Sequence, residues 1–79
     1  MTERIAAAVY AALGRQLGVE ATVIAAAAQR SLEELGLDSH GLMRVLLDIE
    51  QQLELKDLDL PDEALTSPAA MIAGVAARV

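Results

Sequence analysis

The hydrophobic residues of this chain are almost all aliphatic, and this limits how the chain can fold. They make up 54% of its 79 residues, but Tyr10 is the single aromatic side chain. The core therefore has to be built from Leu, Ile, Val, Met and Ala, a set that favours helix over strand. A chain of this length buries one small core, so we expect a single all-α domain over residues 1–79.

The N-terminal part predicts a helix from about residue 3 to residue 17. Thr2 is suited to the N-cap, and Gly18 is suited to the position that ends the helix. Apolar residues recur at every fourth position of this segment. They are Ile5, Val9, Leu13 and Leu17, with Ala8 and Ala12 beside them.

Residues 19–38 give a mixed signal. The β-branched residues 22–24 resist helix, whereas the alanine run that follows them favours it. Ser31 and Glu34 resemble the two partners of a capped turn, which Gly36 would end. We therefore expect a long connection that contains one short helical turn.

A second main helix is predicted over residues 39–53, with Asp38 as its N-cap, where a negative charge suits the helix dipole. One apolar stripe should face the core, and the opposite face should look outward. The inward stripe is Leu42, Leu46, Ile49 and Leu53, and the outward residues are His40, Met43, Arg44 and Leu47.

The C-terminal part predicts a loop and two helices. Residues 54–60 alternate charged residues with leucines, which suggests a strand, but no partner strand is visible, so a loop anchored by its leucines is favoured. Pro61 opens a short helix to about Leu65, with the proline in the first turn. The last helix has Ser67 as its cap and runs over residues 68–78. Its expected buried residues are Ile72, Val75, Ala76 and Val79.

The charge of the chain argues against several classes of function. Twelve acidic and six basic residues give a net charge of −6, which disfavours binding to nucleic acid and suits partners with basic patches. The chain has no cysteine, no apolar run near the ~18 residues that span a bilayer, and no signal-peptide pattern. We expect a cytoplasmic monomer that does not insert into membranes.

The segment Leu35-Gly36-Leu37-Asp38-Ser39 is the candidate functional motif. A serine at the start of a helix, directly after a glycine turn, is exposed and rigidly held. The N-terminus of that helix would stabilise a phosphodiester formed on the serine oxygen. From the Asp-Ser pair alone, the favoured interpretation is that Ser39 or Asp38 only caps a helix, since such caps are common.

Catalytic and metal-binding alternatives are weaker. Consecutive residues on a helix do not face each other, so His40 is poorly placed to activate Ser39, and Asp48 is too far along the helix to orient His40. A single histidine without cysteine makes a zinc site improbable. The acidic segment 57–63 lacks the glycine and glutamate spacing of a calcium-binding EF-hand loop, so we expect no metal site.

The wider pattern resembles the acyl carrier protein family. The resemblance is dense from about residue 32 to residue 63. Its motifs are Leu35-Gly36-Leu37-Asp38-Ser39, the helix that follows, and Pro61-Asp62-Glu63. It implies a four-helix bundle of three main helices and one short one, with a long connection between the first two main helices. It also implies that a phosphopantetheinyl transferase attaches 4'-phosphopantetheine from coenzyme A to Ser39, and that Asp38 supports this modification.

The chain departs from the usual carriers of fatty acid synthesis along the second main helix. His40 stands where leucine is common, and Arg44 where an apolar residue follows an acidic one. Glu50 is followed by two glutamines in place of an acidic triplet, and the segment after Leu53 is longer than usual. These changes either indicate a dedicated set of partner enzymes or are neutral surface substitutions. The expected docking residues are His40, Met43, Arg44, Leu47 and Glu50.

The resemblance therefore implies a carrier protein and not an enzyme. The carrier would hold acyl or aminoacyl groups as thioesters and present them to loading and downstream biosynthetic enzymes, outside housekeeping fatty acid synthesis. The alternative is an unmodified helical adaptor that binds a partner through Met43 and Leu47. The cargo, the pathway and the loading enzyme are not specified by the sequence.

Overall fold

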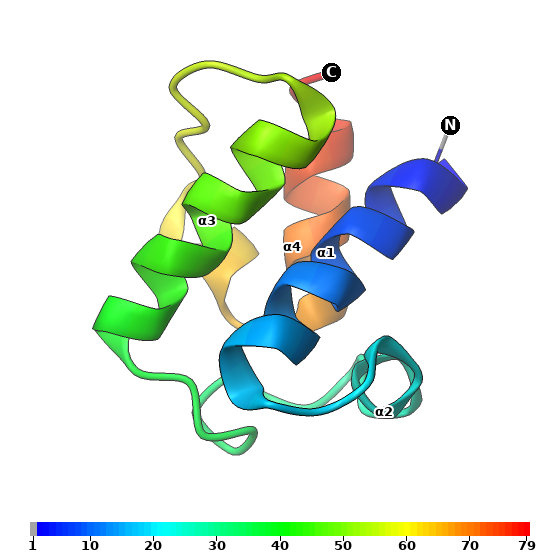
Figure 1. Cartoon of the computed structure of the whole chain (residues 1–79). Helices are drawn as coiled ribbons and strands as arrows, with labels where there is room; N and C mark the ends of the chain where they lie inside the picture. Colours follow the sequence, from blue (N-terminus) through cyan, green and yellow to red (C-terminus); the bar gives the residue numbers. More distant parts are fainter. Residues whose placement is uncertain (1) are drawn as a thin grey trace.

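All regular elements within residues 2–79, the part of the chain described by the computed structural model, are helical (Figure 1). In chain order they are α1 (Thr2–Leu17), α2 (Ala21–Ala26), α3 (Ser39–Leu53), the 3-10 helix η1 (Asp62–Leu65) and α4 (Pro68–Ala76). The predicted all-α bundle, with three main helices and a short one, is confirmed. Met1, where the predicted domain begins, lies outside the described residues.

Helix α1 is the centre of the bundle, because it packs against α2, α3 and α4. It ends as predicted at Gly18, whose φ of +74° is left-handed, and the Val19 amide donates to the Gly14 carbonyl at 2.9 Å. The predicted N-cap at Thr2 is corrected, since Thr2 is already the first residue of the helix.

Helix α2 lies within the predicted long connection, at a place where we expected no helix. The β-branched residues 22–24 form its middle, contrary to their low helix propensity. Packing accounts for the difference, since Ile24 is only 1% exposed and belongs to the core. Gly14 lets the chain pass close to α1, because a Cβ on it would lie 2.6 Å from the Val19 carbonyl oxygen. Tertiary contacts thus outweigh local propensity in this six-residue helix.

The predicted capped turn follows α2. The Glu34 amide donates to the Ser31 hydroxyl at 3.0 Å, and the Ser31 amide donates to the Glu34 carboxylate at 3.2 Å. The Ser31 amide and hydroxyl lower the pKa of Glu34. Gly36 ends the turn with a φ of +92°. The buried Leu32 also donates its amide to the Thr66 carbonyl at 2.9 Å, which links this turn to the segment before α4.

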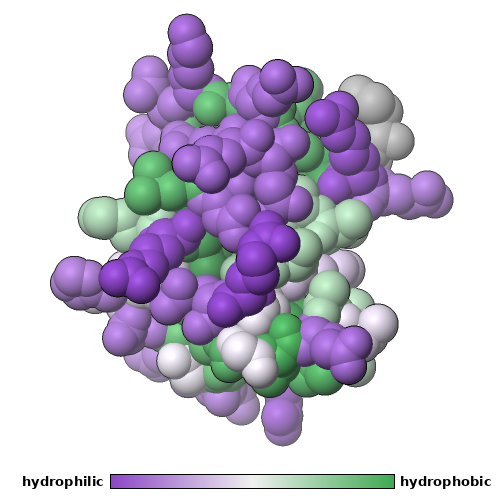
Figure 2. Space-filling view, viewed as in Figure 1, coloured by the Kyte–Doolittle hydropathy of each residue, from purple (hydrophilic) through white to green (hydrophobic). Residues whose placement is uncertain are grey.

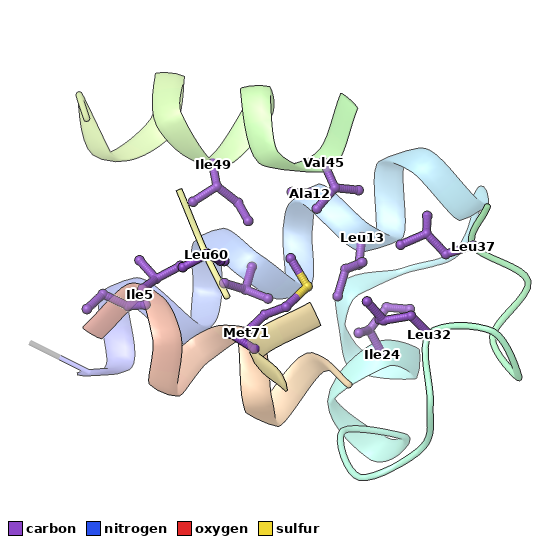
Figure 3. Close-up of a cluster of buried hydrophobic side chains, with 13 residues drawn as sticks. Ile5, Ala12, Leu13, Ile24, Leu32, Leu37, Val45, Ile49, Leu60 and Met71 are labelled. Atoms are coloured by element: carbon purple, nitrogen blue, oxygen red, sulfur yellow. The ribbon is translucent and has the colours of Figure 1, made fainter. Parts of the chain in front are cut away.

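The core lies between α3 on one side and α1 and α4 on the other (Figure 3). From α3, Val45 and Ile49 point into it, so Val45 belongs to the buried stripe, whereas the predicted inward leucines 42, 46 and 53 are only half-buried. From α4, the side chain of Met71 enters the core and is 0% exposed. Val79, predicted to be buried, is 55% exposed because α4 ends at Ala76, two residues before the expected end.

Residues 54–60 form the predicted leucine-anchored loop. Leu60 is buried, and Leu55 and Leu58 are half-buried against the core. Two hydrogen bonds hold the loop: the Glu50 carboxylate accepts from the Leu58 amide at 2.7 Å, and Arg78 donates to the Asp59 carbonyl at 2.7 Å.

The two C-terminal helices begin close to their predicted positions. Pro61 is the N-cap of η1 and not a first-turn residue. Ser67 caps α4 as predicted, since its hydroxyl accepts from the Ala70 amide at 3.1 Å. No helix within residues 2–79 has the length and apolar character needed to cross a bilayer. Helix α1 begins and α4 ends at one end of the bundle, whereas α3 begins at the other (Figure 1).

Candidate functional site

Ser39 is the first residue of α3 and is exposed. The helix covers residues 39–53, as predicted, and Asp38 is its N-cap. The Asp38 carboxylate accepts from the Gly41 amide at 2.7 Å. A Cβ on Gly41 would lie 2.9 Å from Leu37 and 3.1 Å from this carboxylate, so glycine leaves room for the cap. The hydroxyl of Ser39 is therefore held at a well-defined place on the surface.

The start of α3 is electrostatically suited to an anionic group on the Ser39 oxygen. Helix α3 has fifteen residues, and its unpaired amides and dipole favour negative charge near the first turn. Asp38 already uses one of these amides, that of Gly41. A phosphodiester on the serine oxygen would be attached next to the remaining ones.

An open hollow of about 620 Å³ lies beside Ser39. It is lined by apolar side chains and has hydroxyl and carboxylate groups around them. The lining residues are Ser31, Leu32, Glu33, Leu37, Asp38, Ser39, Leu42, Leu65 and Thr66. They come from the capped turn, the start of α3 and the end of η1. Such a mixed lining suits a flexible chain that carries both amide and methyl groups.

The outward residues of α3 lie where the sequence predicts them. We call His40, Met43, Arg44 and Leu47 the outer α3 face. All four are exposed, Met43 by 67% and Leu47 by 54%. In Figure 2, hydrophobic side chains emerge among hydrophilic ones over α3. Large apolar side chains at this exposure are typical of contact surfaces when they cluster.

Glu50, the fifth expected docking residue, is placed differently. It is half-buried, and its carboxylate binds the Leu58 amide of the following loop. Asp48, the other acidic residue of this helix, is bound by the guanidinium of Arg15 on α1 at 2.8 Å. Both acidic side chains of α3 are thus engaged within the molecule.

The arrangement does not provide a hydrolase triad. Ser39 and His40 are consecutive on the helix, so their side chains diverge. Asp48, the one aspartate of α3, is paired with Arg15 and does not orient His40. Within the described residues, no three His, Cys, Asp or Glu side chains lie close enough to hold a metal ion.

Comparison with known proteins identifies the family. The family model for the phosphopantetheine attachment site matches residues 7–79, which is most of the chain. The chain belongs to this family. The carrier therefore bears a 4'-phosphopantetheine group derived from coenzyme A, and carrier domains of this family are not catalytic. The resemblance to acyl carrier proteins is confirmed, whereas no curated protein and no solved structure matches the chain.

The residues of this carrier fit such a group. An exposed serine hydroxyl at a helix start is a suitable attachment point for a phosphodiester, and the adjoining hollow is apolar enough to hold part of a pantetheine chain. The sequence alone does not reveal the hollow, because Leu65 and Thr66 reach it from a distant segment. The hydrogen bond from the Leu32 amide to the Thr66 carbonyl brings the two segments together.

Proposed function

We propose that Ser39 is the attachment point of the phosphopantetheine group and that the chain carries acyl or aminoacyl intermediates on it. The observation that carries this proposal is the exposed Ser39 hydroxyl at the start of α3, beside an apolar hollow. When bound, the group supplies a terminal thiol that holds its cargo as a thioester. Beside Ser39, the Asp38 carboxylate caps the helix and the His40 side chain diverges from the serine, so the chain orients the attachment point and presents the cargo to other enzymes without transforming it.

Asp38 has two parts in this proposal. Its carboxylate fixes the first turn of α3 through the Gly41 amide, which sets the position of the Ser39 oxygen. It is also exposed, so it is accessible to the transferase and to a magnesium ion that the transferase brings. We assign it a supporting role in the modification reaction.

The partners in this proposal are a phosphopantetheinyl transferase and the enzymes that load and process the cargo. They would contact the outer α3 face, which is next to Ser39 and exposes two large apolar side chains. Because this face has a cation and no free carboxylate, we propose a pathway other than housekeeping fatty acid synthesis. We also propose that residues 1–79 act as one monomeric domain that binds these partners in turn.

The modification is tested by intact mass. The purified apo chain is incubated with coenzyme A, magnesium and a broad-specificity phosphopantetheinyl transferase. We expect one added phosphopantetheine, and none in the Ser39→Ala variant. Ser67→Ala is the matched control, since it removes a serine hydroxyl that caps α4 and does not line the hollow. It should still be modified.

Two results would contradict the proposal. If several active transferases add no mass to the wild-type chain, it is not a substrate, and the unmodified adaptor becomes the better explanation. If Ser39→Ala still gains the same mass, the group is attached elsewhere. Fragmentation of the modified chain by mass spectrometry then identifies the residue that carries it.

A further inference from the structure

The outer α3 face differs in charge from the rest of the molecule. The chain as a whole carries a net charge of −6. Both acidic side chains within α3 are held by other groups of the molecule: Asp48 is paired with the cation of Arg15, and the Glu50 carboxylate, which keeps its charge, accepts from the Leu58 amide. Arg44 is exposed there and, within residues 2–79, forms no ion pair.

The geometry of α3 places this cation among apolar side chains. Met43 and Leu47 are four residues apart and so lie on one side of the helix, with Arg44 directly beside them. Met43 and Leu47 are 67% and 54% exposed. A partner that covers them must also accommodate the guanidinium of Arg44, and burying it without an anion would be costly.

We propose that the enzymes that act on this carrier dock on the outer α3 face through an apolar socket bordered by a carboxylate, which pairs with Arg44. This inference rests on the proposed function and specifies its partners. The remaining acidic residues attract basic surfaces at long range, but salt screens exposed charges beyond about 8 Å under physiological conditions. At the face itself, Arg44 is an exposed charge without an ion pair in the described residues, so a partner that covers it has to supply the anion.

The same observations indicate weak and reversible docking. Two exposed apolar side chains and one cation cover far less than the area of a permanent interface. Each exposed charge pair contributes at most about 1 kcal/mol. A carrier that visits several enzymes in turn needs such short-lived contacts, with specificity set by charge and shape.

Binding of the Ser39→Ala chain tests the proposal without the phosphopantetheine group. The probes are two purified carrier-loading enzymes of known structure. One has aspartates and glutamates on its carrier-facing surface, and the other has lysines and arginines there. We expect tighter binding to the acidic surface, measured by calorimetry or by NMR titration. Adding Arg44→Glu should weaken that binding by roughly tenfold and reverse the preference between the two enzymes.

Arg4→Glu is the matched control. It changes the net charge by the same amount, is exposed, and lies in the first turn of α1, away from the outer α3 face. It should leave the preference unchanged. Circular dichroism of the Arg44→Glu variant should match that of the parent, because Arg44 makes no ion pair within residues 2–79 whose loss would unfold α3.

The proposal is overturned if the parent chain prefers the basic enzyme, binds neither enzyme, or loses no affinity on Arg44→Glu. These results are independent of the modification assay. A chain that gains the expected mass but fails here is a carrier with a different docking chemistry. A chain that binds the two enzymes as expected but gains no mass in the modification assay has the docking surface and lacks the proposed attachment site.

Discussion

The guanidinium of Arg15 on α1 binds the carboxylate of Asp48 on α3 through two hydrogen bonds of 2.8 and 2.9 Å. The Gln52 amide joins them, since it donates to Asp48 at 3.2 Å and to the Ala8 carbonyl of α1 at 3.1 Å. The hydrogen bond with Asp48 raises the pKa of Arg15. A polar network thus joins the two helices outside the core.

This network should make a small contribution to stability. Arg15→Ala and Asp48→Ala should each lower the free energy of unfolding by about 1 kcal/mol or less, because Arg15 is exposed and Asp48 only half-buried. Urea denaturation of the single and double variants gives the coupling energy, which we expect to favour the pair. Arg4→Ala is the control for loss of an α1 cation. A coupling energy of zero would mean that the two side chains do not interact in solution.

Met71 and Met43 allow a direct comparison, because the same substitution should cost much stability at one position and little at the other. Met71 is 0% exposed, so Met71→Ala leaves a cavity and should lower the free energy of unfolding by about 2–5 kcal/mol. Met43→Ala should change it by less than about 0.5 kcal/mol. Urea denaturation measures both. Equal losses in the two variants would show that Met43 is also buried.

The capped turn before α3 should depend on pH through Glu34. Its pKa is lowered by the Ser31 amide and hydroxyl, so the carboxylate stabilises the folded state above the unfolded pKa of about 4.3, and this contribution is lost as pH falls through the folded value. Ser31→Ala removes the hydroxyl, and NMR titration should then show the Glu34 pKa moving back up. Ser67→Ala, which alters another cap, should leave it where it is. An unchanged Glu34 pKa in Ser31→Ala would contradict the contribution of the hydroxyl, since the Ser31 amide, the larger cause, remains in this variant.

Gly74 on α4 should resist substitution despite the higher helix propensity of alanine. A Cβ at this position would lie 2.7 Å from the Ala64 Cβ of η1, so Gly74→Ala should lower the free energy of unfolding by about 1–3 kcal/mol. Combining it with Ala64→Gly should recover part of the loss. Thermal unfolding of the single and double variants checks this. If the loss of stability in the double variant equals the sum of the losses in the two single variants, a Cβ at position 74 does not clash with Ala64.

The sequence predicted those elements whose periodicity, caps and breakers agree. α3 is the clearest case, since the Asp38 cap and the apolar spacing define both of its ends. α2 was missed, because its stability depends on burying Ile24 against distant residues, and a propensity scale contains no such term. The wrong prediction for Val79 followed from extending the α4 pattern beyond the point where that helix ends.

The candidate site was predictable where it depends on local helix geometry and not where it depends on contacts between distant segments. Exposure of Met43 and Leu47 follows from helix geometry once the inward face is known. The engagement of Glu50 does not, because it depends on the path of the loop that follows, where Glu54 and Asp57 adopt left-handed conformations that are uncommon for residues other than glycine. The hollow beside Ser39 likewise needs two segments that meet only in the folded chain.

The arrangement of the helix ends has a practical consequence. Helix α1 begins and α4 ends at one end of the bundle, and Ser39 lies at the other, where α3 begins (Figure 1). A molecule attached to a bead, a sensor chip or a neighbouring domain through either terminus would therefore keep Ser39 at the end of the bundle that is farther from the support. Immobilisation would leave it open to whatever enzyme is passed over the surface.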